Sequence, residues 1–156
     1  MALENVKKHK VLPEHIQWLG DSFKLSDAVG MTSEQLTLAL PSLELLEIPK
    51  FSPIIKEHEK GDDLFVIYKG EVSVNKTKEY LGPVEIVRLG PGAFFGEIAL
   101  LGRPERTATV SSEADCRIFR MAAAEVKALL VANPALAEHL KKIAEERLQK
   151  LSEASK

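Results

Sequence analysis

The feature that most constrains the fold is a region of short apolar period between about Leu45 and Met121. In residues 71–75, Val72 and Val74 alternate with polar residues, which is typical of a strand with one face toward water. The run 64–68 is apolar throughout, so both faces of that strand are expected to be buried. Turn signals separate the runs at residues 60–63, 69–70, 75–78, 81–83 and 90–92. Many short strands with such punctuation predict a sandwich or barrel.

A helical pattern precedes this region. Residues 1–44 carry apolar side chains at a loose helical spacing, most clearly over 16–25. Further along, Thr32–Gln35 matches a capping box in front of an apolar run, and Pro41 is expected to end or kink that helix. The first part of the chain is therefore predicted to be a helical N-terminal segment.

The helical period returns over residues 122–156. Asn133–Pro134 fits the start of a new helix, with asparagine as the N-cap and proline at the first helical position. An apolar stripe then runs from Leu136 to Leu151, and it fits packing on the chain's own sheet as well as a partner helix or a lid. We predict one domain in all: helices over 1–44, a β region over 45–121 and helices over 122–156.

Charge and cysteine content exclude several classes of protein. With 156 residues and a net charge of −2, the chain has the size of one domain and no bulk basic charge to attract nucleic acid or an anionic membrane. Cys116 is the only cysteine, so an internal disulfide is excluded. No apolar run approaches the roughly 20 residues that span a bilayer. We expect a cytoplasmic protein without membrane insertion.

The segment Phe95–Val110 combines residues that suit a phosphate-bearing ligand. Gly96 lets the backbone approach a ligand closely, and a short helical turn after it would point N–H groups at an anion. Glu97 can accept a hydrogen bond from a hydroxyl, and the guanidinium of Arg106 can hold two phosphate oxygens at once. Taken singly, such residues are usually surface charges or turns. Their ordered combination indicates a binding site.

This segment closely resembles the phosphate-binding cassette of cyclic nucleotide-binding domains. The resemblance rests on Phe-Gly-Glu-Ile-Ala-Leu at 95–100 and Arg-Thr-Ala-Thr-Val at 106–110. It extends from about residue 45 to 150, and departs from the family at Phe51–Pro53, where a glycine is common. Such domains occur in regulatory subunits of cAMP-dependent kinase, in cGMP-dependent kinase, in cyclic-nucleotide-gated channels and in the catabolite activator protein.

The resemblance implies a fold and a set of contacts. The fold is an antiparallel β-roll of jelly-roll type, mainly β, with N-terminal helices and a C-terminal lid helix. Glu97 would bind the ribose 2′-hydroxyl and Arg106 the cyclic phosphate, with Thr107 beside the phosphate and the base. The remaining implied ligand-binding residues are Phe95, Gly96, Ile98, Ala99 and Ala108 in the cassette, and Val84 or Leu89 packing on the base together with a side chain of the last helix.

The implied function is that of a regulatory or sensor domain without enzymatic activity, cofactor or metal. It would bind cAMP or cGMP and signal by repositioning its C-terminal helix, and the 134–151 helix would contact a second copy or an effector protein. A hydroxyl at Thr107 can reach the guanine amino group, whereas analogy with bacterial members of the fold favours cAMP. The base therefore stays open at this stage.

Three alternatives carry different expectations. A DNA-binding regulator needs a helix-turn-helix beyond the last helix, and direct nucleic-acid contact is not expected from these 156 residues; a ligand-sensing fragment of such a regulator or of an ion channel remains open. A metal-dependent jelly-roll enzyme needs clustered ligands, whereas His9, His15, His58 and His139 are scattered. A protein-interaction scaffold with a degenerate pocket stays open as an alternative, and the intact Glu97 and Arg106 argue against it.

Overall fold

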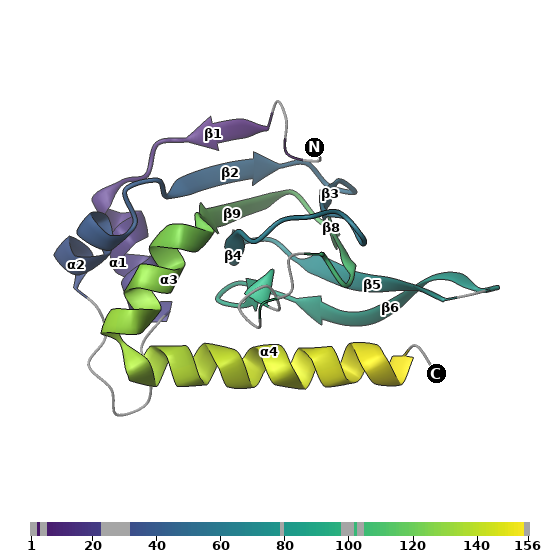
Figure 1. The fold of residues 1–156 in the computed structure, drawn as a ribbon. Helices are drawn as coiled ribbons and strands as arrows, with labels where there is room; N and C mark the ends of the chain where they lie inside the picture. Colours follow the sequence, from purple (N-terminus) through teal and green to yellow (C-terminus); the bar gives the residue numbers. More distant parts are fainter. Residues whose placement is uncertain are drawn as a thin grey trace.

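Two antiparallel sheets form the centre of the molecule in the computed structural model (Figure 1). The structure describes residues 3, 6–22, 32–78, 80–97, 102 and 105–154. One sheet has the strand order β1-β2-β9-β4-β7, from Lys7–His9, Glu44–Ile48, Cys116–Met121, Leu64–Lys69 and Phe94–Phe95. The other has the order β3-β8-β5-β6, from Pro53–Ile55, Thr109–Ser112, Val72–Lys78 and Gly82–Leu89.

Four helices flank the sheets in the described part of the chain. They are α1 (Pro13–Ser22), α2 (Ser33–Ala39), α3 (Ala123–Ala132) and α4 (Pro134–Ala154). Figure 1 shows α1, α2 and α3 gathered at one end, while α4 runs along the length of the β region beside β6. The predicted fold class, an antiparallel jelly roll with flanking helices, is confirmed.

Strand β4 separates two hydrophobic cores, because its alternate side chains point to opposite faces. Leu64 and Val66 face the core between the first sheet and the helices, and Phe65 and Ile67 face the core between the two sheets. All four side chains are buried, in agreement with the burial of both faces that was predicted for the apolar run 64–68. Tyr68, the last residue of the run, is only partly buried.

Helix α4 contributes to both cores. Leu136 and Leu140, near its beginning, belong to the core beneath the helices. Leu151, near its end, belongs to the core between the sheets and is 4% exposed. The apolar stripe from Leu136 to Leu151 therefore packs on the chain's own domain, and the opposite face of α4 is charged.

The N-terminal segment differs from the all-helical expectation, because Lys7–His9 forms strand β1 at the edge of the first sheet. It pairs antiparallel with β2, with Lys8 opposite Leu46. The Nζ atom of Lys8 lies 2.5 Å from a carboxylate oxygen of Glu44. This contact joins residues that are far apart in the sequence, so a local helical period could not predict it. The apolar positions 23 and 25 lie outside the described residues.

The predicted capping box is present at the beginning of α2. The Thr32 hydroxyl accepts a hydrogen bond from the Gln35 backbone N–H at 3.1 Å. The Gln35 side chain accepts in return from the Thr32 backbone N–H at 2.9 Å. Two N–H groups that the helix leaves without an intrahelical partner are thereby satisfied.

Candidate ligand-binding site

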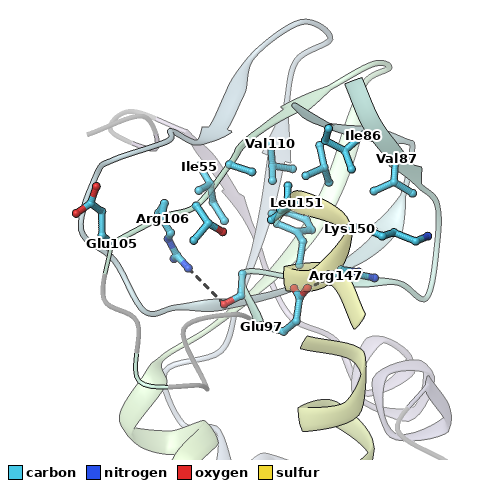
Figure 2. Close-up of a pocket in the computed structure, with 15 residues that line it drawn as sticks. Ile55, Ile86, Val87, Glu97, Glu105, Arg106, Val110, Arg147, Lys150 and Leu151 are labelled. Carbon is cyan, nitrogen blue, oxygen red and sulfur yellow. Dashed lines mark hydrogen bonds and ion pairs between the residues drawn. The ribbon is translucent and has the colours of Figure 1, made fainter. Parts of the chain in front are cut away.

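A cavity of about 50 Å³ opens between the four-stranded sheet, the segment after β7 and the end of α4 (Figure 2). Its polar end is formed by Glu97, Arg106, Thr107 and Arg147. Its apolar end is formed by Ile55, Val74, Ile86, Val87, Val110 and Leu151. A charged end joined to an apolar end suits a ligand that has an ionic head and a flat, largely apolar body.

Phe95 and Gly96 fix the start of the cassette. Phe95 is buried, pairs with Phe65 across β7 and β4, and stacks on its ring with the centroids 4.9 Å apart. Gly96 has a φ of 83°, and a Cβ atom there would lie 2.7 Å from the backbone oxygen of Asp63. Only glycine fits this conformation and this space, so the chain can turn toward the cavity immediately after the sheet.

Backbone groups of neighbouring segments hold Arg106 in place through both its own backbone and its guanidinium. Its backbone N–H donates to the carbonyl of Glu59 at 2.7 Å, and its own carbonyl accepts from the N–H of His58 at 2.8 Å. Its Nη2 donates to the carbonyl of Asp63 at 3.1 Å, and its Nη1 donates more weakly to that of Gly96 at 3.4 Å. Neutral carbonyl oxygens thus aim the guanidinium without neutralising it.

Within the described residues, Arg106 has no carboxylate at ion-pair distance. Burial lowers the pKa of its guanidinium, although the more distant charges of Asp63, Asp62 and Glu97 oppose this shift. A partly buried cation without a paired anion is costly, and a bound anion would relieve that cost. The geometry of Arg106 therefore points to an anionic ligand.

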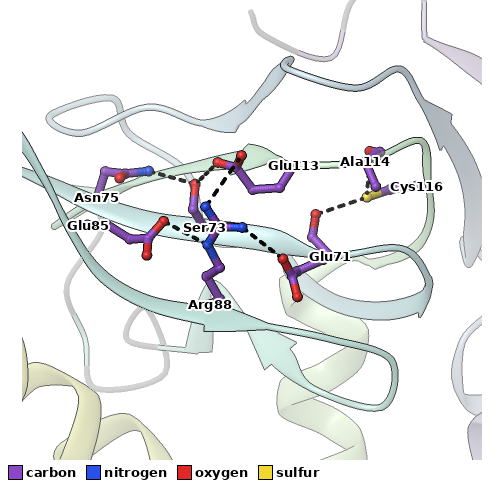
Figure 3. A network of polar contacts seen from close by, with 8 residues as sticks. All are labelled: Glu71, Ser73, Asn75, Glu85, Arg88, Glu113, Ala114 and Cys116. Carbon is purple, nitrogen blue, oxygen red and sulfur yellow. Dashed lines mark hydrogen bonds and ion pairs between the residues drawn. The ribbon is translucent and has the colours of Figure 1, made fainter.

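Arg88, in strand β6, contrasts with Arg106 and lies on the outer face of the four-stranded sheet (Figure 3). Its guanidinium lies 2.9 Å from Glu85, 3.0 Å from Glu71 and 3.9 Å from Glu113. This exposed arginine is surrounded by carboxylates, and their hydrogen bonds raise its pKa. Carboxylates of the chain therefore neutralise Arg88, whereas among the described residues no carboxylate pairs with Arg106.

Glu97 is buried and paired with a residue from the last helix. Its Oε1 lies 2.9 Å from Nη1 of Arg147, which also donates to the backbone carbonyl of Phe94. Burial raises the pKa of Glu97, and the charges of Arg147 and Arg106 only partly offset this. The carboxylate in the cassette is thus held by α4 across the mouth of the cavity.

The sequence interpretation did not identify Arg147. A signal for it exists, because Ala144, Arg147 and Leu151 follow the i, i+3, i+7 spacing of one helix face. Ala144 and Leu151 are buried, so Arg147 is a charged residue on the apolar side of α4. A charge in that position requires a buried or half-buried partner, and Glu97 provides it.

The apolar end differs from the predicted contacts at Val84 and Leu89, neither of which lines the cavity. Val74 pairs with Val87 whereas Asn75 pairs with Glu85, so a bulge leaves Ile86 as an extra residue in β6. Ile86 and Val87 both line the cavity as a result. Val84 lies nearer the hairpin tip, opposite Lys76, and Leu89 packs against the core between the sheets.

The other predicted site residues fall into two groups. Phe95, Gly96, Thr107 and Ala108 line the cavity together with Glu97 and Arg106. Ile98 and Ala99 lie outside the described residues. The carbonyl of Thr107 accepts a hydrogen bond from Nζ of Lys76 at 3.1 Å, so a side chain of β5 supports the backbone of the cassette at Thr107.

Over the ranges that the structure describes, histidine, cysteine and acidic side chains form no group of three that could hold a metal ion. None of the described helices has both the length and the apolar character that crossing a bilayer requires.

The jelly roll and the glycine–glutamate–arginine cassette define a class of ligand-binding domain. The sequence profile of the cyclic nucleotide-binding domain matches residues 45–133. The chain belongs to the cyclic nucleotide-binding domain family.

Individual relatives are consistent with this membership. The chain is 37% identical over 106 residues to a cyclic nucleotide-gated potassium channel of Mesorhizobium japonicum. The aligned region covers 68% of the chain and 28% of the channel. It is 30% identical over 122 residues to the cyclic AMP receptor protein of Thermus thermophilus. This aligned region covers 77% of the chain and 56% of that protein. The chain thus corresponds to only a part of either relative.

A solved structure supports the fold. A cyclic nucleotide-binding domain from Methylobacillus flagellatus superposes with a TM-score of 0.71 and 20% sequence identity, covering 96% of this chain and 83% of that one. At this level of identity the likeness concerns the architecture alone.

Proposed function

We propose that this chain binds a cyclic nucleotide monophosphate, cAMP or cGMP, as a regulatory or sensor domain in the cytoplasm. The observation that carries the proposal is Arg106: a partly buried guanidinium, aimed into the cavity by carbonyl oxygens, without an ion-pair partner within the described part. A cyclic phosphate carries one negative charge and two exocyclic oxygens, which match a guanidinium. Each charge-assisted hydrogen bond contributes about 1.5–3 kcal/mol.

Glu97 would take the ribose. Its carboxylate lies at the polar end of the same cavity as Arg106, and Arg147 already holds it in place. A carboxylate accepts hydrogen bonds only, so it suits a hydroxyl donor next to a phosphate. The base would then extend toward the apolar end, between the strands β5 and β6 and the end of α4.

Ligand entry would require α4 to move. The cavity of about 50 Å³ is small against the roughly 300–1,000 Å³ of typical small-molecule sites. Arg147, Lys150 and Leu151 line it from α4, so this end of the helix is the part that a nucleotide would displace. We infer that the nucleotide unseats the end of α4 and settles it in a new position, and that an effector protein or a second copy of the chain senses the change through residues 134–151.

Calorimetric titration of the purified chain with cAMP and cGMP tests the proposal. Wild type should bind at least one of them, and Arg106→Ala should weaken binding by roughly 100-fold or more, from the loss of two charge-assisted hydrogen bonds. Arg88→Ala is the matched control, because it removes an arginine outside the cavity and should leave the affinity unchanged. If wild type binds no cyclic mononucleotide, the proposal fails and the protein-scaffold alternative takes its place.

A further inference from the structure

We propose that Lys150 makes this site prefer cyclic nucleotides whose base carries an oxygen at position 6, as in guanine and hypoxanthine, over the 6-amino base adenine. The inference rests on the proposed function and specifies its ligand. It reverses the expectation of cAMP that analogy alone favours. Lys150 was not among the residues that the sequence singled out.

Lys150 lies near the end of α4, next to Leu151, and lines the cavity with Ile86 and Val87 of β6. Figure 2 shows Lys150 beside Val87, on the side of the cavity away from Arg106, with Glu97 between them. A nucleotide with its phosphate at Arg106 and its ribose at Glu97 would therefore extend its base toward this side of the cavity. A pivot of α4 about its anchored first turns would keep Lys150 on that side.

The side chains that line the apolar end of the cavity cannot form a hydrogen bond with a base. They belong to Ile55, Val74, Ile86, Val87, Val110 and Leu151. Lys150 has three donors and no acceptor. Within the described residues its ammonium makes no ion pair and no hydrogen bond, so it is available to a ligand.

The edges of the two purines differ in their response to such a donor. Guanine presents two acceptors there, N7 and O6, whereas adenine presents the N7 acceptor beside the N6 amino donor. An ammonium attracts the first pattern and meets a like-signed donor in the second. Because Lys150 is exposed and its charge is screened by solvent, we expect a preference of about three- to tenfold.

Cyclic IMP separates this contact from that of Thr107. Inosine has the 6-oxygen of guanine but lacks its 2-amino group, which is the group that a hydroxyl at Thr107 can reach. A preference for cyclic IMP over cAMP therefore reports on position 6 alone. A preference for cGMP over cyclic IMP reports on position 2.

The experiment is a set of calorimetric titrations with cAMP, cGMP and cyclic IMP. For wild type, cyclic IMP and cGMP should bind about three- to tenfold more tightly than cAMP. Lys150→Met should bring cyclic IMP and cAMP to equal affinity, Lys150→Glu should favour cAMP, and Lys150→Arg should keep the wild-type order. Lys142→Met removes the same charge from the outer face of α4, which does not line the cavity, and should also keep the wild-type order.

The outcomes separate this inference from the proposed function. If wild type binds cAMP and cyclic IMP equally, or if Lys150→Met leaves their ratio unchanged, Lys150 does not select the base although the chain is a nucleotide receptor. If none of the three nucleotides binds wild type, the proposed function itself fails. Thermal unfolding of each variant verifies that it is folded, and little change is expected because Lys150 is exposed.

Discussion

Arg147 in the last helix and Glu97 in the cassette form an ion pair of 2.9 Å that closes the polar end of the cavity. The two residues are separated by 50 positions in the sequence. The Glu97 side chain is buried, and the Arg147 side chain is half-buried. In this structure Arg147 occupies the Glu97 carboxylate, which is the group that we propose binds the ribose. We therefore expect binding of a ligand and docking of α4 to be coupled through the Glu97 carboxylate.

Removal of Arg147 should reveal the strength of this pair. Arg147→Met should lower the free energy of unfolding by about 1–3 kcal/mol, because Glu97 would remain buried without its partner. The double variant Glu97→Gln with Arg147→Met should lose less than the sum of the single losses. Urea unfolding of the four proteins measures the coupling, and strictly additive losses would contradict a direct interaction.

The pH dependence of stability should carry the signature of Glu97. Burial raises its pKa above the ordinary value of 4.5, so its contribution to stability is fully present below pH 4.5 and is lost as the pH rises through the raised pKa. Glu97→Gln cannot ionise. The stability of wild type relative to this variant should therefore fall as the pH rises above 4.5, as urea unfolding between pH 4 and 8 would measure. A difference that grows in the opposite direction would contradict the raised pKa.

Glycine at position 96 should be irreplaceable for two separate reasons. Gly82→Ala has the same unfavourable sign of φ, at 70°, but nothing within 4 Å, so it isolates the conformational cost of about 1–2 kcal/mol. Gly96→Ala adds a contact of 2.7 Å with the carbonyl of Asp63 and should cost at least about 1 kcal/mol more. Equal losses in thermal or urea unfolding would show that the close approach is unimportant.

Ligand binding should change the protection of the end of α4. We expect amide hydrogen exchange over residues 147–151 to differ between the free and the nucleotide-saturated protein, because Arg147 and Leu151 line the cavity. The amides of α1, which does not line it, serve as the internal reference. An unchanged exchange rate in α4 at saturation would rule out its role as the moving element.

Thr107 should contribute to recognition of a 2-amino group. Thr107→Ala should weaken cGMP more than cAMP in paired titrations, because only guanine offers an amino group that the hydroxyl can reach. Thr77→Ala, on the exposed part of β5 and outside the cavity, should change neither affinity. Equal weakening of both nucleotides would assign Thr107 to the phosphate alone.

Local patterns predicted much of this fold. The continuous apolar run in β4 indicated burial on both faces, and the structure has one core on each side of that strand. The capping box at Thr32 was equally local. The order of the cassette residues indicated that Gly96, Glu97 and Arg106 would meet, and they line one cavity.

The features that sequence reasoning missed depend on contacts between distant segments. Strand β1 is short and polar, and it is held by pairing with β2 and by the ion pair of Lys8 with Glu44. The bulge that turns Ile86 into the cavity arises from the register between two strands, which no single strand encodes. Arg147 acquires its role only when α4 packs against the cassette.

The attachment of α4 to two separate cores determines how the helix can respond. A ligand that displaces Leu151 leaves Leu136 and Leu140 anchored beneath the other helices, so the helix would pivot and not detach. From Leu140 to Ala154 it is about 21 Å long, at 1.5 Å per residue. A tilt of about 10° at the anchor would then carry its far end about 4 Å. We therefore expect a pivot of α4 to move the residues that line the cavity and the end of the helix together, with the displacement greatest at Ala154.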